Sequence, residues 1–132
     1  MMFTGDPATI GTEGGFKLTV PSIEATGANL DDANLFCAIL EGAIFDHASL
    51  RNAYMEGAEA QGASFINADM RGVDLYFADV TDANLSGANL AGSLLVDSDY
   101  TDANFDGANL ADADLSRAEL RRCSFRGANM RG

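Results

Sequence analysis

The chain has few of the residues that support catalysis, metal binding or a disulfide framework. Its 132 residues include no tryptophan, one histidine, two prolines and two cysteines. Cys37 and Cys123 are too far apart in sequence to suggest a metal site or a disulfide scaffold. The N-terminus lacks the basic start and apolar segment of a secretory signal. We therefore expect a cytoplasmic protein with two free thiols.

Basic residues and long apolar runs are also scarce. Eight Lys and Arg residues stand against twenty Asp and Glu residues, which gives a formal net charge of -12. Because duplex binding needs Lys and Arg across the contact surface, we expect no direct nucleic-acid binding. No apolar run is long enough to cross a bilayer, so we expect no membrane insertion.

What the sequence has instead is a period of five residues. From Leu30 to Met130, every fifth residue can occupy an apolar interior, and we call these 21 residues the centres. The residue two positions earlier is Ala in 17 of the 21 cases. Five residues rotate a helix by about 500°, so successive centres would spiral around it. Positions two apart share one face of an extended segment, and Gly, Asn, Asp and Ser near the corners favour turns. The pattern therefore predicts a solenoid.

The phenylalanines among the centres indicate how many sides each coil has. Phe45, Phe65, Phe105 and Phe125 are separated by multiples of twenty residues, and Leu85 fills the gap. A four-sided coil of twenty residues stacks all five into one core ladder, whereas a three-sided coil of fifteen scatters them. We therefore predict four sides.

The motif A-(N/D)-L-x-x, as in Ala28-Asn29-Leu30, Ala83-Asn84-Leu85 and Ala108-Asn109-Leu110, resembles the pentapeptide-repeat family, which is abundant in bacteria and especially cyanobacteria. The resemblance implies an all-β fold: a right-handed quadrilateral parallel β-helix with four pentapeptides per coil and about five coils. We assign residues 28–132 to the β-helix, 16–27 to an N-terminal cap or irregular first coil, and 1–15 to a flexible tail.

No catalytic, cofactor-binding or metal-binding residues are predicted. His47 is a lone histidine at an outward position, Cys37 also faces outward, and Cys123 replaces an inward Ala. The glycine-rich stretch at 11–15 lacks the lysine and the strand–helix setting of a phosphate loop. We expect a protein that is not an enzyme.

One side of the predicted coil carries an acidic stripe, which offers a surface for a basic partner or simply keeps the rod in solution. The stripe comprises Glu41, Glu59, Asp79, Asp82, Asp99, Asp102 and Glu119.

The neighbouring side carries an apolar patch of outward residues, a feature typical of interaction surfaces. The patch comprises Phe36, Tyr54, Tyr76, Phe77, Leu94 and Val96. Two alternatives remain open: these side chains pack on the backbone at the corners, or N-terminal residues such as Met1, Met2 and Phe3 cover them.

The last coil carries an arginine cluster, which we expect to ring an open end of the rod. The cluster comprises Arg117, Arg121, Arg122, Arg126 and Arg131. Charge at this end prevents edge-to-edge stacking, takes part in a homodimer through the coil end, or docks on an acidic surface.

These features predict a non-catalytic rod that binds a protein partner of unknown identity. The alternative follows from the resemblance. Some members, the quinolone-resistance proteins, bind DNA gyrase, and the proposed basis is that their acidic rod imitates DNA. The acidic stripe supports this reading. The absence of protruding loops and of a recognisable C-terminal dimerisation element counts against it.

Overall fold

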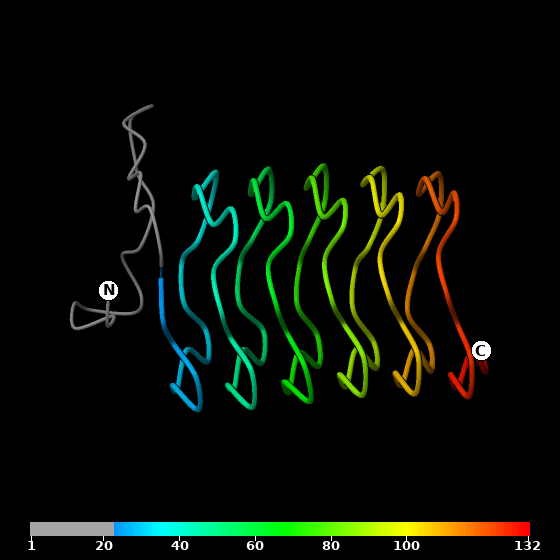
Figure 1. Ribbon diagram of the computed structural model, residues 1–132, viewed down its shortest axis with the longest axis horizontal. Coiled ribbons are helices and arrows are strands. Elements are labelled where there is room, and N and C mark those ends of the chain that lie inside the picture. The colour runs from blue at the N-terminus through cyan, green and yellow to red at the C-terminus, as the bar shows by residue number, and fades with distance from the viewer. Residues whose placement is uncertain (1–22) are drawn as a thin grey trace.

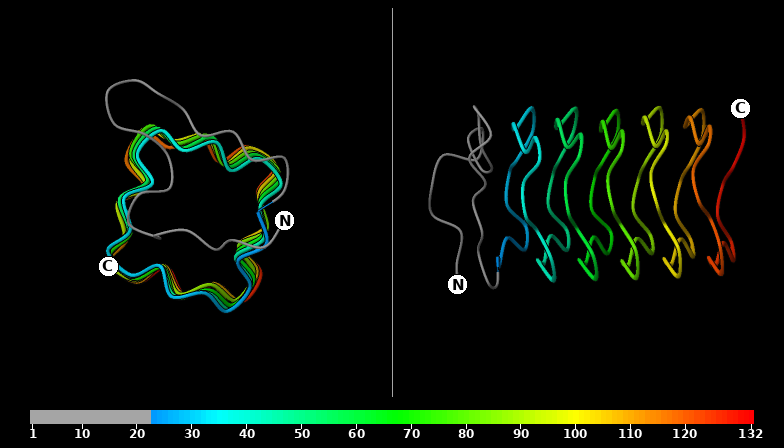
Figure 2. Two further views of the ribbon diagram at one scale, coloured as in Figure 1. Left: turned by 90° about the vertical axis from the view of Figure 1, so that its left-hand side faces the viewer. Right: turned by 90° about the horizontal axis from the view of Figure 1, so that it is seen from above.

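The computed structural model describes residues 23–132, which wind into a rod of stacked four-sided coils (Figure 1). Seen along its axis, the rod has a quadrilateral outline in which successive coils superimpose (Figure 2). The fold is the right-handed quadrilateral β-helix that the sequence predicted. The predictions for residues 1–22, including the tail and most of the cap, lie outside the described residues.

Parallel bridges between residues twenty positions apart hold the coils together. They run without a break in register from Glu24↔Ile44 to Asn109↔Asn129. Each bridge is a single residue long, and residues 23–132 contain no helix and no longer strand. The twenty-residue period confirms the four-sided coil. Residues 23–27, assigned to the cap from the sequence, already follow the regular pattern, since Glu24 bridges to Ile44 and Ala25 is buried.

We number the four sides by their centres. Side 1 has centres 30, 50, 70, 90, 110 and 130; side 2 has 35, 55, 75, 95 and 115. Side 3 has 40, 60, 80, 100 and 120; side 4 has 45, 65, 85, 105 and 125. The chain passes through them in this order, so each corner joins two consecutively numbered sides.

Each corner is a four-residue turn. We call its two central residues the first and second turn residues, and the second is left-handed. In the first of these corners, the Ala28 N–H donates to the Ala25 carbonyl at 3.0 Å. From Gly27 to Gly127, the second turn residue has a φ between 53° and 69°. Positive φ at this residue alone is typical of type II turns, which favour Gly or Asn there. The rod therefore needs a left-handed residue every five positions.

In the inner coils, four of the five backbone N–H groups of a typical repeat have backbone partners. Around Leu90, the Ala88 N–H donates to Leu85 across the turn at 3.1 Å. The N–H groups of Asn89, Leu90 and Gly92 donate to the preceding or following coil at 2.9, 2.7 and 2.9 Å. The remaining donor is the first turn residue.

A side chain accepts that fifth hydrogen bond. The Ala91 N–H donates to the Asn89 side chain at 3.2 Å, and the Thr101 N–H donates to Asp99 at 2.9 Å. Elsewhere an Asp of the preceding coil takes this role, as Asp46 does for the Ile66 N–H at 3.0 Å. This is the physical reason for the Asn or Asp in A-(N/D)-L, because an unpaired N–H costs free energy wherever water cannot reach it.

The core is a column of small and large inward side chains. Phe45 and Phe65 stack with centroids 5.2 Å apart, and Phe105 stacks on Phe125 at 5.0 Å. Leu85 lies fully buried between the two pairs. Toward the C-terminal end the burial decreases: Leu115, Leu120 and Phe125 are only partly buried, and Met130 is 50% exposed.

Tyr100 is the exception in this apolar column. Its side chain is fully buried, and no hydrogen bond of good geometry reaches its hydroxyl, although the Ser98 side chain lies near it. Ser98, on the same side, donates its own hydroxyl to the Leu75 carbonyl. The phenol therefore contributes packing area but leaves a polar group unsatisfied.

Replacing this tyrosine with phenylalanine should stabilise the rod. Removal of a buried, unpaired hydroxyl recovers about 1 kcal/mol or more, so Tyr100→Phe should raise the Tm measured by far-UV circular dichroism. The matched control is Phe105→Tyr, which introduces a hydroxyl into the same core and should lower the Tm. A lower Tm for Tyr100→Phe would show that the hydroxyl makes a stabilising contact.

Candidate functional site

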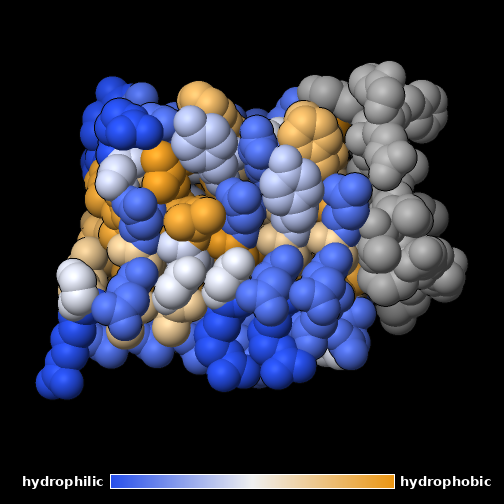
Figure 3. All heavy atoms as spheres, turned by 180° about the vertical axis from the view of Figure 1, so that it is seen from behind, coloured by the Kyte–Doolittle hydropathy of each residue, from blue (hydrophilic) through white to orange (hydrophobic). Residues whose placement is uncertain are grey.

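The structure places the apolar patch on side 2 and along its corner with side 3. Tyr54 and Leu94 lie at the middle of side 2 and are 39% and 47% exposed. Phe36, Tyr76, Phe77 and Val96 occupy the corner turns, where Phe77 is 60% exposed. Among residues 23–132, the large hydrophobic side chains classed as exposed are Tyr54, Phe77, Leu94 and, at the last coil, Met130. Figure 3 shows a face of the rod on which hydrophobic side chains reach the surface between polar neighbours.

The aromatic side chains of the patch contact one another. Phe36 and Tyr54, from adjacent coils, stack with centroids 5.6 Å apart and rings 5° from parallel. Tyr76 and Phe77 are tilted, with centroids 4.3 Å apart. The Tyr54 hydroxyl donates to Glu56 at 2.6 Å, and this hydrogen bond raises the pKa of Tyr54 to about 12. The aromatic residues of the patch thus form two contacting pairs. Coverage by Met1, Met2 and Phe3 falls outside the described residues.

Three patch residues occupy positions that the repeat usually fills with turn-forming residues. Tyr54 and Leu94 stand where Asn or Asp accepts the first turn N–H; leucine has no acceptor, and the tyrosine hydroxyl is directed to Glu56. Phe77 is the left-handed corner residue, with φ 55°. Bulky residues are uncommon at positive φ because Cβ crowds the backbone. The hydrophobicity of the patch is visible in the sequence, whereas these local costs are not.

The acidic stripe lies on side 3 and its corner with side 4. Bridges connect Glu59, Asp79, Asp99 and Glu119 in four successive coils, so their carboxylates repeat at about 4.8 Å. Asp79 accepts from the Thr81 N–H at 3.1 Å and from Gln61 at 2.8 Å. Some of these carboxylates therefore also stabilise turns.

The C-terminal part of the stripe is paired with arginines. Arg122 binds Asp102 at 2.7 Å and lowers the pKa of that carboxyl. Arg121 binds Glu119 at 2.9 Å. The negative charge of side 3 is consequently concentrated in the earlier coils.

The arginine cluster does not point away from the coil end as a group. Arg117 and Arg122 reach back one coil to Asp97 and Asp102, each at 2.7 Å. The backbone N–H groups of Arg126 and Arg131 donate to Asp106 and Asn129 at 2.9 and 3.3 Å. The predicted ring around the end is thus engaged in part along the rod, and the coil-end homodimer stays a prediction.

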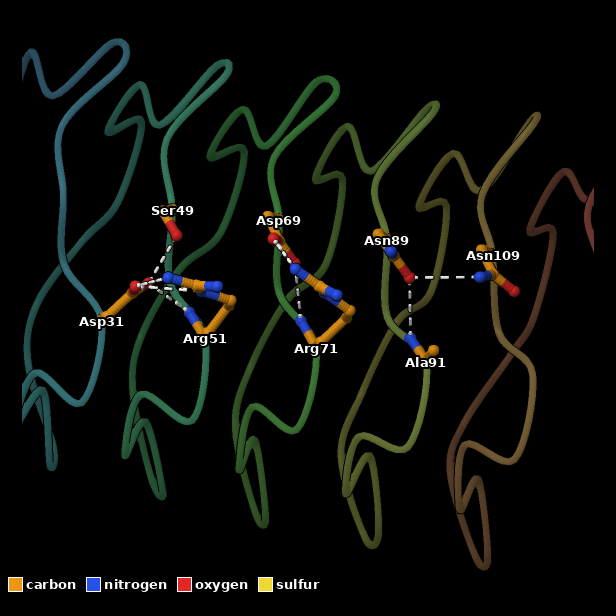
Figure 4. A network of polar contacts seen from close by, with 8 residues as sticks. All are labelled: Asp31, Ser49, Arg51, Asp69, Arg71, Asn89, Ala91 and Asn109. Carbon is orange, nitrogen blue, oxygen red and sulfur yellow. Dashed lines mark hydrogen bonds and ion pairs between the residues drawn. The ribbon is translucent and has the colours of Figure 1, made fainter.

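Side 1 carries a polar network that the sequence analysis did not single out (Figure 4). Asp31 accepts from Ser49 at 2.5 Å and from the N–H and Nε of Arg51 at 3.0 and 2.9 Å. The hydrogen bond from the Arg51 guanidinium is the main cause that lowers the pKa of Asp31 to about 2. Farther along, the Asn109 amide donates to Asn89 at 3.2 Å. This network links adjacent coils.

No arrangement on the described part of the chain suggests catalysis. His47 is an exposed corner residue with φ 60°, and Cys37 and Cys123 are free thiols. Within residues 23–132, no group of three or more His, Cys, Asp or Glu side chains is placed to hold a metal ion. The same residues form no helix of the length and apolarity that a membrane span requires.

The chain matches the pentapeptide repeats family over residues 24–52, 48–87, 83–122 and 98–132. No curated protein matches the chain. Among solved structures, it is similar to a thylakoid-lumen pentapeptide repeat protein of Arabidopsis thaliana, with 32% identity and a TM-score of 0.61. That match covers 74% of this chain and 71% of the other.

A second similar structure is HetL, a pentapeptide repeat protein involved in heterocyst differentiation regulation in Nostoc sp. strain PCC 7120. The identity is 29% and the TM-score 0.60, over 85% of this chain and 54% of HetL, so the chain spans about half the length of HetL. QnrB1, a plasmid-mediated fluoroquinolone resistance protein, matches 99% of this chain and 80% of its own at 19% identity and a TM-score of 0.46, which is too distant to bear on function.

The chain therefore belongs to the pentapeptide-repeat family, as the A-(N/D)-L motifs predicted. Nothing in the described structure or in these relatives points to an enzyme.

The Asp31–Arg51 pair should make stability depend on pH at the acid end. Because the pKa of Asp31 is lowered from 3.8 to about 2, its contribution is present above pH 3.8 and is lost as the pH falls through 2. Asp31→Asn should therefore lower the Tm at pH 7, and its difference from the wild type should shrink between pH 4 and pH 2. Asp32→Asn, at the adjacent exposed corner, is the control and should have little effect. A pH-independent difference would contradict the assignment.

Proposed function

We propose that the protein is a non-catalytic interaction rod that binds a protein partner through the apolar patch on side 2. The proposal is supported chiefly by the positions of the exposed hydrophobic residues in the repeat. Tyr54, Phe77 and Leu94 lie on the same surface of successive coils, and each replaces a residue type that the turn favours.

The free-energy costs of these three residues favour a role in binding over a role in folding. A bulky left-handed residue such as Phe77 costs roughly 1–2 kcal/mol relative to glycine. Loss of a turn hydrogen bond, as at Leu94, costs about 1 kcal/mol. The apolar side chains recover only part of this in the free rod, because Tyr54, Phe77 and Leu94 stay 39%, 60% and 47% exposed. Residues that lower stability and cluster on one surface are typical of functional sites.

Replacing two of these residues with asparagine should separate stability from binding. Phe77→Asn with Leu94→Asn restores a turn-favouring residue and an N–H acceptor, so the Tm should rise by a few degrees. The same double variant should lose partner binding, because it removes two exposed apolar anchors. The Tm is measured by circular dichroism, and binding by affinity capture from the source organism with quantitative mass spectrometry.

The matched control makes the same two kinds of change away from side 2. Ile44→Asn adds an acceptor on side 4, and His47→Asn changes the left-handed residue at the next corner. This variant should retain every protein that the wild type captures. If the side 2 variant also retains them all, the proposed binding surface is wrong.

A second candidate function, an acidic rod that imitates DNA, has one observation in its favour. Glu59, Asp79 and Asp99 stand in register on side 3 of three successive coils. Regularly repeated negative charge is the property that a DNA-binding protein recognises without reading bases. The arginine pairs at Asp102 and Glu119 shorten this charged row.

A gyrase supercoiling assay, with and without a quinolone, tests the second candidate. Inhibition or drug protection should appear on titration with the wild type and be lost when Asp79, Asp82 and Asp99 become Asn. These amides keep a side-chain oxygen for the turns, so the fold should be retained. Absence of any effect at large protein excess would exclude gyrase as the partner.

A further inference from the structure

The surroundings of the apolar patch are acidic throughout its length. Sides 2 and 3 of four successive coils comprise residues 33–42, 53–62, 73–82 and 93–102. These residues include nine Asp or Glu and no Lys, Arg or His. Phe36, Tyr76, Phe77 and Val96 lie at the corner between the two sides, so the hydrophobic and acidic surfaces adjoin.

The arginines of neighbouring segments compensate this charge only at its edges. Arg117 and Arg122, from the following coil, pair with Asp97 and Asp102. On the far edge of side 2, Arg51 and Arg71 pair with Asp31 and Asp69 of side 1. Glu56, Asp74, Asp79 and Asp99 lie between these two sets. Of these four, Asp99 is also attracted by Arg121, so the field over the patch is negative chiefly in its earlier coils.

Resting on the proposed function, we infer that the partner segment is a basic amphipathic helix that lies along the corner between sides 2 and 3. Its apolar stripe covers the apolar patch, and its Lys and Arg residues face the carboxylates of side 3. Charge complementarity selects this chemistry, because nucleic acids and anionic membranes carry the same sign as the surface. A second copy would bring identical carboxylates together and is disfavoured for the same reason.

The backbone of the sides excludes an added strand as the mode of binding. Strand addition needs free N–H and C=O groups on the recognised edge. On the sides of this rod, the backbone groups bond along the axis to the adjacent coils. Recognition must therefore use side chains. From Phe36 to Val96 the patch spans three coil spacings, about 14 Å, which equals about ten helical residues at 1.5 Å each.

Fluorescence anisotropy with synthetic helices tests the inference on the full chain. The probe is a fluorescein-labelled peptide with leucines on one helical face and lysines elsewhere. One companion peptide has glutamates in place of the lysines, and another has the same composition in scrambled order. The basic amphipathic helix should bind, and its companions should bind roughly tenfold more weakly or not at all.

Three variants locate the binding. The Phe77→Asn, Leu94→Asn protein should bind the basic helix roughly tenfold more weakly than the wild type. Asp79→Asn with Asp99→Asn should weaken it roughly threefold and reduce its dependence on salt. The Ile44→Asn, His47→Asn control should bind as the wild type does. Circular dichroism of each variant verifies the fold.

The outcomes distinguish this inference from the proposed function. If the glutamate or scrambled peptide binds as tightly as the basic helix, the basic amphipathic partner is refuted. Should that binding still need Phe77 and Leu94, the apolar patch remains a binding surface. If the basic helix binds the Phe77→Asn, Leu94→Asn protein undiminished, the location on side 2 is overturned. Affinity capture with the same variant then decides whether the proposed function survives.

Discussion

The rod depends on backbone hydrogen bonds between residues twenty positions apart. A coil can repeat these bonds only if each corner turns the chain by the same angle, and this requires a left-handed residue every fifth position. The same geometry uses four of the five N–H groups in each repeat and leaves one, at the first turn residue. The Asn or Asp before each centre supplies its acceptor. Inward Ala and Leu fill the core, but the hydrogen-bond requirement determines the polar residues between them.

This requirement distinguishes the residues that the turns need from residues that lower the stability of the turns. At the corners, Gly, Asn and Asp satisfy the turn, and most outward residues before the centres are Asn, Asp or Ser. Tyr54, Phe77 and Leu94 depart from this rule, and all three lie on one surface. Other residues also depart from it, but none of them is an exposed large hydrophobic side chain. At the corners these are Cys37, His47, Arg117 and Arg122, and before the centres they are Ile39, Ile44, Glu59 and Glu119. Side 2 is therefore the surface on which exposed hydrophobic residues most consistently replace residues that the turns favour.

The sequence predicted the fold because the period is visible in single residues. The spacing of Phe45, Phe65, Phe105 and Phe125 was sufficient for the four-sided coil, and sorting positions by side located the apolar patch and the acidic stripe. The sequence could not show which carboxylates are paired. Arg122 was predicted to project at the coil end, but its partner Asp102 lies twenty residues earlier. That direction depends on side-chain conformation, which the repeat does not specify. The left-handed corner position was also missed, because Cys37, His47, Phe77 and Arg117 hide the preference for Gly, Asn and Asp.

The four-sided coil also limits how such a protein can change its length in evolution. Insertion of one pentapeptide leaves every inward position inward, so the core tolerates it. The insertion nevertheless rotates all later repeats by a quarter turn relative to the earlier ones. After such an event within residues 56–76, Tyr54 and Leu94 would lie on adjacent sides, and no partner could contact both along a straight line. Duplication of a whole coil preserves every surface. The unit that folds is therefore five residues long, while the unit that can be inherited without disrupting a binding surface is twenty.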